Sequence, residues 1–276
     1  MGTLYLVATP IGNLRDVSLR ALDVLREAPL IAAEDTRSAR KLLDHFEIGA
    51  KVTSYNDHNA RAKTPLLLAA LAAGDVAVIS DAGMPGISDP GHGLVLAAIE
   101  AGHVVTPIPG ASAVVAAVAA SGLSSRRFHY LGFLPRQGGP RRRALMAAAA
   151  SGDTLVVYES PHRVRATLED ALAALGERRV AVCRELTKLH EEIWRGTLSG
   201  ALARFAEPRG EFTLVIEGGA PAEAGDEPAT AGDIAAAIAA MRTEGVPARV
   251  AVREVARRFG LSRRAAYAAW HRAVEA

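Results

Sequence analysis

Three glycine- and proline-rich loops follow apolar runs of the sequence, and their composition suits close contact with a ligand. The longest, residues 80–91 (SDAGMPGISDPG), holds three glycines and two prolines. Glycines let main-chain groups approach a ligand, and prolines hold a loop in one shape. Because a purely structural turn seldom needs twelve such residues, a ligand-binding loop is favoured here.

The other two loops carry a weaker signal when each is taken alone. Residues 9–14 (TPIGNL) lack the three-glycine dinucleotide fingerprint and the lysine of a P-loop, and a plain turn explains them as well. Residues 107–113 (PIPGASA) open a helix, where small residues also serve tight helix–sheet packing. Three such loops at one sheet edge nevertheless favour a shared cleft.

Polar clusters stand at the ends of further predicted strands. They are residues 34–37 (EDTR), 158–163 (YESPHR) and 184–188 (RELTK). Each cluster by itself is explained by helix capping or ion pairing. Their repeated placement after strands favours a polar site that faces a cleft between domains.

The elements that position these loops alternate between strands and helices. Short apolar runs predict strands at 4–8, 30–33, 76–79 and 104–105, with helices near 65–73, 93–101 and 111–121. Ser18 and Thr36 are expected to cap two further helices. Apolar strands separated by helices predict a parallel sheet with both faces covered.

The second half repeats the alternation after a stretch at 135–143 that we expect to be a basic, flexible loop. Strands are predicted at 154–158, 179–184 and 212–217, helices at 162–174 and 198–206, a linker at 218–232, and helices at 231–243, 248–258 and 262–275. We therefore expect an α/β protein with domains 1–120 and 121–220, completed by a linker and helical domain at 221–276.

Composition narrows the function classes further. The 276 residues carry a net charge of only +2, so any basic surface must be local. Cys183 is the single cysteine, so an intramolecular disulfide is excluded, and this cysteine content fits a reducing cytoplasm. We expect Cys183 to be a small buried residue of a strand. The sequence shows no pattern of a signal peptide, a membrane span or a nucleophile elbow. His190-Glu191-Glu192 lacks the second histidine of a helical zinc motif, so no metal site is expected.

In order along the chain, seven motifs resemble the ribosomal small-subunit methyltransferase I family of the tetrapyrrole methylase superfamily. The motifs are LYLVATPIGNL, IAAEDTRSARKLL, SDAGMPGISDPG, PIPGASAVVAA, GFLPR, YESPHR and RELTK, within residues 3–217. The resemblance implies a class III methyltransferase, usually a homodimer, that modifies cytidine 1402 of 16S rRNA at its 2′-hydroxyl.

The same resemblance implies that S-adenosylmethionine binds in the cleft between two α/β domains. The cofactor contacts carried over motif by motif are Ile11, Gly12, Gly83, Met84, Ile87, Ser112, Ala113, Tyr158, Leu186, Phe212 and Thr213. Met84 departs from the family, where this position is often polar. A main-chain contact survives that change, but a side-chain hydrogen bond does not.

Transfer of a methyl group to a ribose hydroxyl requires in-line positioning and a partner for the hydroxyl proton. The expected polar set around the ribose is Lys188, Glu185, Asp35 and Arg37, with Glu159 as a further candidate. Lys188 could lower the pKa of the hydroxyl, or act as a base if it is desolvated.

The last helices are rich in arginine and have the pattern of a helix-turn-helix around residues 255–262. Tyr267 and Trp270 could stack on bases or pack in a core. The expected RNA contacts are Arg141, Arg142, Arg143, Arg249, Arg253, Arg257, Arg263 and Arg264, on 16S rRNA or the small ribosomal subunit. A small solvated helical cap is the competing interpretation.

Two other functions remain open at this point. A methyltransferase for a tetrapyrrole or another small acceptor is compatible with the family fold, although the basic tail and the EDTR and RELTK motifs disfavour it. A non-enzymatic nucleic-acid-binding protein is the second alternative, and binding of S-adenosylmethionine would exclude it.

Overall fold

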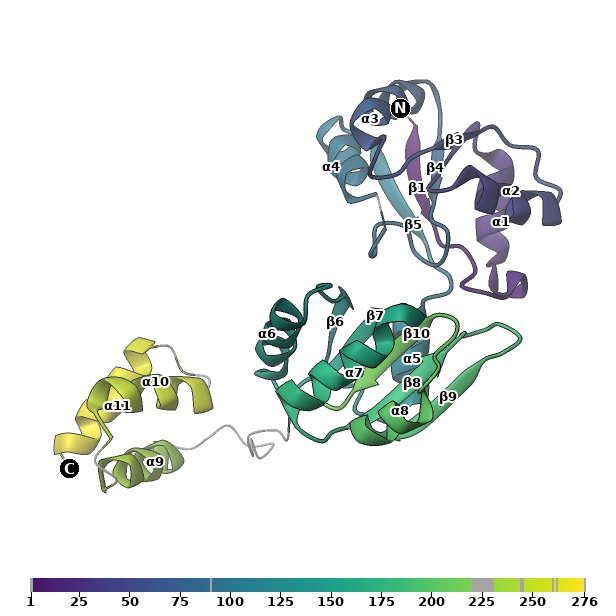
Figure 1. Cartoon of the computed structure of the whole chain (residues 1–276). Helices are drawn as coiled ribbons and strands as arrows, with labels where there is room; N and C mark the ends of the chain where they lie inside the picture. The colour runs from purple at the N-terminus through teal and green to yellow at the C-terminus, as the bar shows by residue number, and fades with distance from the viewer. Residues whose placement is uncertain are drawn as a thin grey trace. The chain divides into compact units, whose positions relative to one another are not determined.

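The chain forms two compact units, Met1–Gly218 and Gly219–Ala276. The computed structural model describes residues 2–89, 91–219, 231–243, 246–259, 261 and 263–275, and for 231, 257, 258, 263 and 272–275 it describes the main chain alone. Figure 1 shows the helices and strands of both units. Most of the predicted linker, residues 220–230, lies outside the described part.

The first sheet is entirely parallel, as the sequence predicts. Its strands are β1 (Thr3–Val7), β2 (Leu30–Ala33), β3 (Val52–Ser54), β4 (Val76–Ile79) and β5 (Val104–Ile108), in the order β3-β2-β4-β1-β5. Leu4 lies opposite Val76 on one side and Val105 on the other. Because every strand runs the same way, the loops after all of them meet at one edge.

Helices cover both faces of this sheet (Figure 1). The elements are η1 (Leu14–Asp16), α1 (Leu19–Glu27) and α2 (Thr36–His45), followed by α3 (Ala60–Ala73) and α4 (His92–Glu100). Leu25 and Leu43 join Ile31 in a core on one face, whereas Leu67 and Leu94 pack on the other. The strands are therefore apolar on both sides, which explains their unbroken hydrophobic runs.

Helix capping differs from the prediction at one of two positions. The Ser18 hydroxyl accepts a hydrogen bond from Ala21 N at 3.2 Å and caps α1, as expected. The prediction for Thr36 is wrong, because Asp35 is the N-cap of α2 and Thr36 is its first helical residue. The Asp35 carboxylate accepts from Arg37 N at 2.8 Å, and a charged acceptor at this end also complements the helix dipole.

The second sheet is mixed rather than parallel. Its strands are β6 (Phe128–Phe133), β7 (Thr154–Glu159), β8 (Arg179–Arg184), β9 (Glu192–Thr197) and β10 (Phe212–Ile216), in the order β6-β7-β10-β8-β9. Only the β6–β7 pair is parallel, and β10 runs antiparallel to both of its neighbours. One face is covered by α6 (Gly138–Ala149), α7 (Pro161–Leu175) and α8 (Leu198–Arg204).

The other face of the second sheet is covered by α5 (Ala113–Ser121), which follows the last strand of the first sheet. Val114 and Val118 pack against Val156, Ala181 and Val215. The chain thus leaves the first sheet at Ile108 and reaches the second within residues 109–112. These four residues belong to the third glycine-containing loop.

The prediction of a flexible basic loop at 135–143 is wrong from Gly138 onward, where α6 begins. Pro140 lies in the first turn, where a missing N–H costs no helical hydrogen bond. Leu145 and Arg141 are buried on the face toward α7. The prediction is wrong because Gly138, Gly139 and Pro140, which are typical of loops, form the first turn of this helix.

In the described part of the second unit, three helices pack around an apolar core of their own. They are α9 (Ala231–Thr243), α10 (Ala248–Arg258) and α11 (Arg263–Glu275). Ile238, Val255 and Ala266 are buried in the core together with Trp270, so packing rather than base stacking accounts for that tryptophan. Tyr267 is exposed. Among the described helices of the whole chain, none is long and apolar enough to cross a membrane.

Candidate active site

The three glycine-containing loops meet at the carboxyl edge of the first sheet. Thr9 N donates to Gly83 O at 2.9 Å, and Gly83 N donates to Thr9 O at 3.1 Å. Gly83 has a φ of +82°, a conformation that favours glycine, and a Cβ there would lie 3.5 Å from Ala111 O and from Ile11 Cγ2. The loops expected to share a cleft are therefore in direct contact.

Residues 185–188, in the loop between β8 and β9 of the second sheet, lie against the first of these loops. A Cβ on Gly12 would come within 2.4 Å of Lys188 Cγ and 2.8 Å of Thr187 Oγ1. Only glycine permits this approach without a shift of the neighbouring chain. Gly12 thus brings the TPIGNL and RELTK motifs together, although they are far apart in the sequence.

The 185–188 loop has unusual backbone angles. Glu185 and Thr187 have φ values of 52° and 67°, in a region that β-branched residues such as threonine rarely adopt. Thr187 Oγ1 is buried and has no hydrogen-bond partner among the described residues. Strain of this kind costs about 1–3 kcal/mol per residue and clusters at ligand sites. The loop therefore has the character of a binding loop.

Lys188 lies between two carboxylates. Its Nζ is 2.9 Å from Glu185 Oε1 and 2.7 Å from Glu211 Oε2. Burial alone would lower the Lys188 pKa, but the hydrogen bonds and charges of both glutamates outweigh burial and raise it. In this arrangement Lys188 is a cation rather than a proton acceptor, so the alternative of a lysine base is disfavoured.

Glu34, Asp81 and Asp89 form a group of carboxylates where β2 and β4 end. Glu34 Oε2 accepts from Asp81 N at 3.3 Å. Burial, together with the charge of Glu34, raises the pKa of Asp89 to about 6, and burial also raises the pKa of Glu34. The EDTR motif predicts Glu34 at this edge. The composition of residues 80–91 points only to a glycine loop and not to Asp81 and Asp89, although two Ser-Asp pairs contain them.

Aromatic side chains line the site on the second sheet. The ring centroids of Tyr130 and Phe133 lie 5.1 and 5.8 Å from that of Tyr158. The Tyr130 hydroxyl is 2.6 Å from Ser88 Oγ, which ties this sheet to the second loop. We call Tyr130, Phe133 and Tyr158 the aromatic wall. Burial raises the pKa of Tyr130 and of Tyr158, so both hydroxyls are neutral hydrogen-bonding groups.

Comparison with known proteins identifies the family. The family model described as tetrapyrrole (corrin/porphyrin) methylases matches residues 3–202. A ribosomal RNA small subunit methyltransferase I of Halalkalibacterium halodurans is 54% identical over 220 residues, covering 79% of this chain and 76% of the relative. The one of Streptococcus pyogenes serotype M1 is 41% identical and covers 98% and 95%. The chain belongs to this family.

Membership in the ribosomal RNA small subunit methyltransferase I family makes the chain a methyltransferase that uses S-adenosylmethionine. Solved structures support the fold alone. A diphthine synthase has a TM-score of 0.63 at 17% identity, covering 78% of this chain and 90% of its own. The cobalt precorrin-4 methyltransferase CbiF has a TM-score of 0.59 at 18% identity, covering 77% and 94%.

The cofactor contacts expected from family motifs fall into two groups. Ile11, Ala113, Tyr158 and Leu186 share one apolar cluster on the α5 face of the second sheet. Gly12, Gly83, Met84, Ile87 and Ser112 stand in the three loops, and Ile87 is half exposed. These residues are the surface that we expect to hold the cofactor.

Phe212 does not belong to that surface. Its side chain is buried on the opposite face of the sheet, with its ring centroid 5.7 Å from that of Phe205. Thr213 follows on the α5 face and is buried. The Phe212 ring is therefore part of the core under α7 and α8, and the expected cofactor contact of this residue stays a prediction for its main chain.

Asp35 and Arg37 are paired with each other at the start of α2. Their side chains form an ion pair at 2.9 Å, and the Arg37 side chain is otherwise exposed. The hydrogen bonds from Arg37 hold the pKa of Asp35 below its usual value. Arg37 thus remains available to a substrate anion, whereas the Asp35 carboxylate is occupied by capping and ion pairing.

Glu159 is buried and fully engaged, which corrects its placement beside the ribose. Its carboxylate accepts from Thr167 Oγ1 at 2.7 Å and from Ser160 N at 2.9 Å, and Arg163 Nε lies 3.3 Å away. These contacts fix the first two turns of α7. Glu159 is therefore a structural residue at the end of β7.

Arg141 is also corrected as an RNA contact. Its guanidinium is buried against Asp170 of α7, with Nε 2.7 Å from Oδ2. Arg142 pairs with the same carboxylate but keeps half of its side chain exposed. Arg143 is exposed, as are Arg249, Arg253 and Arg264 in the second unit. The side chains of Arg257 and Arg263 lie outside the described part.

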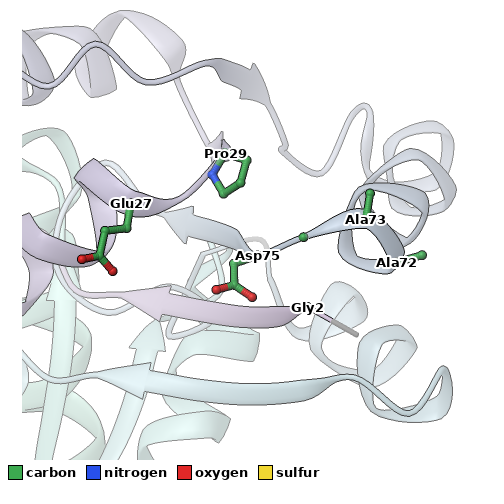
Figure 2. Close-up of a pocket in the computed structure, with 7 residues that line it drawn as sticks. Gly2, Glu27, Pro29, Ala72, Ala73 and Asp75 are labelled. Atoms are coloured by element: carbon green, nitrogen blue, oxygen red, sulfur yellow. The ribbon is translucent and has the colours of Figure 1, made fainter.

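A hollow of about 350 Å³ lies elsewhere, at the amino ends of the first sheet (Figure 2). Gly2, Pro29 and Asp75, which line it, directly precede β1, β2 and β4. The Asp75 carboxylate accepts from Thr3 N at 2.7 Å and so holds the start of β1. Ligands of parallel sheets bind at the other edge, and this hollow is therefore not the candidate site.

Proposed function

We propose that this protein methylates the 2′-hydroxyl of cytidine 1402 in 16S rRNA of the small ribosomal subunit. The names of the 54% and 41% identical relatives support ribosomal RNA as the acceptor. The observation that supports the site assignment is the close approach of the Lys188 side chain to Gly12 in the expected cofactor loop.

S-adenosylmethionine, when bound, supplies a methyl group on a positively charged sulfur. The 2′-oxygen forms a bond to the methyl carbon while the carbon–sulfur bond breaks, and the hydroxyl proton passes to an acceptor. Gly12, Gly83 and Ser112 are the small loop residues that would hold the donor. Lys188, kept protonated by Glu185 and Glu211, stabilises negative charge that develops on the oxygen.

RNA binding is assigned to exposed arginines. Arg249, Arg253 and Arg264 supply phosphate contacts from the helical unit, and Arg142 and Arg143 from α6. Arg257 and Arg263 complete the proposed set. We further propose that the protein works in the cytoplasm as a homodimer.

The decisive test of function is methyl transfer to small-subunit RNA and to assembled subunits, with the product mapped to sugar or base. We expect a 2′-O-methylated cytidine. A base-methylated product would contradict this chemistry, and transfer to a tetrapyrrole but not to RNA would establish the other acceptor class. Calorimetric titration with S-adenosylmethionine tests the non-enzymatic alternative.

The role of Lys188 is tested by two substitutions. Lys188→Met should lower kcat at least about 100-fold, which is typical of a lost transition-state charge contact, with S-adenosylmethionine affinity retained. Lys188→Arg should keep part of the activity because it preserves the charge. Full activity of the methionine variant would show that Lys188 has no part in the reaction.

A further inference from the structure

Phe133 is the one residue of the aromatic wall whose ring is mostly open to solvent. Phe133 is 56% exposed although its ring contacts that of Tyr158, and the other two residues of the wall are only partly accessible. Exposing a large apolar ring costs free energy that burial would have gained. An exposed ring at the rim of a site is therefore a candidate for ligand contact.

A β-bulge gives Phe133 its direction. The register of β6 against β7 runs from Tyr130↔Val156 to Phe133↔Tyr158, so β6 carries one extra residue over this stretch. In a regular strand, residues three apart point to opposite faces. The extra residue, with Gly132 at a φ of +59°, turns Phe133 to the same face as Tyr130.

The bulge also lies against the ligand loops. A Cβ on Gly132 would be 3.2 Å from Ser88 Oγ, the same hydroxyl that bonds to Tyr130. Tyr158 packs in one apolar cluster with Val114, which ties the wall to the start of α5. The position of Phe133 is thus fixed by the contact of Gly132 with Ser88 and by the packing of its ring on Tyr158, and not by burial of the ring itself.

We propose that the Phe133 ring is a stacking platform for an unpaired nucleobase of the RNA, at or next to the methylated nucleotide. This inference rests on the proposed function. Proteins recognise unpaired RNA bases by stacking them on aromatic rings. The exposed Arg136 and Arg143 follow Phe133 in the chain and suit the phosphates that accompany such a base. A single exposed ring, followed in the chain by exposed arginines, fits a nucleotide better than a protein surface, which needs a broader apolar patch.

The test compares Phe133→Leu, which is apolar but cannot stack, with Phe133→Trp, which can. Methylation of in vitro transcribed small-subunit RNA is measured as kcat and KM, and S-adenosylmethionine affinity by calorimetry. We expect the leucine variant to raise the KM for RNA about 5- to 100-fold, the range for one lost base–aromatic stack. The tryptophan variant should restore it, and S-adenosylmethionine affinity should not change.

Phe128→Leu is the matched control, because Phe128 lies on the same strand, is 39% exposed and stands away from the bulge. An equal rise in KM for this control, or an unchanged KM for Phe133→Leu, would overturn the inference. Loss of S-adenosylmethionine affinity in Phe133→Leu would also overturn it, since the ring would then contact the cofactor. A wild-type protein that methylates neither small-subunit RNA nor assembled subunits would instead refute the proposed function itself.

Discussion

Asp89 is a half-buried carboxylate whose pKa depends strongly on its surroundings. It lies among Glu34, Asp81 and the Ser80 hydroxyl, and its pKa of about 6 sits close to physiological pH. A carboxylate accepts a proton only when it is ionised. If Asp89 takes the hydroxyl proton, kcat/KM should fall as the pH drops through about 6.

This prediction is checked by a pH–rate profile of the wild type and of Asp89→Asn. The asparagine variant should lose most of its activity and the limb near pH 6. A control, Asp75→Asn, removes a carboxylate at the opposite edge of the sheet and should leave that limb in place. An unchanged profile in Asp89→Asn would assign the proton to another acceptor.

The raised pKa of Asp89 also makes the free energy of unfolding depend on pH. The folded protein holds this proton more tightly than the unfolded chain, so Asp89 lowers stability as the pH rises from about 4 to 6. Asp89→Asn should therefore stabilise the protein at pH 7 by about 1 kcal/mol, after allowance for solvent screening. In thermal melting, the Asp89→Asn variant should have a higher melting temperature than the wild type at pH 7 but not at pH 4.

At the scale of elements, α6 and α7 are joined by the buried carboxylate of Asp170. Its hydrogen bonds to Arg142 and Arg141 outweigh burial and hold its pKa below the usual value. Asp170→Asn should destabilise the first unit by about 3–5 kcal/mol, because Arg141 would be left buried and unpaired. Chemical denaturation at pH 7 measures the change, which should shrink as the pH falls below about 4.

Glu169→Gln provides the matched control for this prediction. Glu169 precedes Asp170 and pairs with Arg165, but both side chains are about half exposed. An exposed pair of this spacing contributes about 0.3–0.5 kcal/mol. Equal costs for the two variants would show that burial does not set the strength of the Asp170 pair.

The sequence predicts most of the elements but not those shaped by distant partners. Apolar runs are enough to locate β4 and β8, because both are buried on two faces. Strand β6 escapes prediction since the bulge at Gly132 breaks its alternation, and β9 since this edge strand is rich in polar residues such as Glu192 and Arg195. Helix α6 depends on Asp170, which lies almost thirty positions away.

Within the site, local composition marks the loops but not their partners. The glycine loops and the RELTK segment are recognisable because small or charged residues stand directly after strands. The direction of Phe133 and the pKa of Asp89 depend on contacts across the fold, with Tyr158 and Glu34. The burial of Glu159 and Phe212 likewise follows from packing that no local pattern reveals.

At the scale of the whole molecule, the second unit has its own core and carries exposed arginines. Replacing Arg249, Arg253 and Arg264 by glutamine should reduce the slope of log affinity against log salt by about 2, the effect of losing three phosphate contacts. Filter binding of small-subunit RNA over a range of salt concentrations measures it. Replacing the exposed Arg20 and Arg61 of the first domain is the control. An unchanged slope in the triple variant would favour the solvated helical cap.

The passage of the chain at residues 109–112 has one more consequence. Ile108 ends a strand of the first sheet, Val114 packs on the second, and Ser112 between them is an expected cofactor contact. A ligand bound at Ser112 would contact the four-residue connection between the core of the first sheet and that of the second. Saturating S-adenosylmethionine should therefore raise the melting temperature of the Met1–Gly218 unit, which contains both sheets, and differential scanning calorimetry can measure this shift.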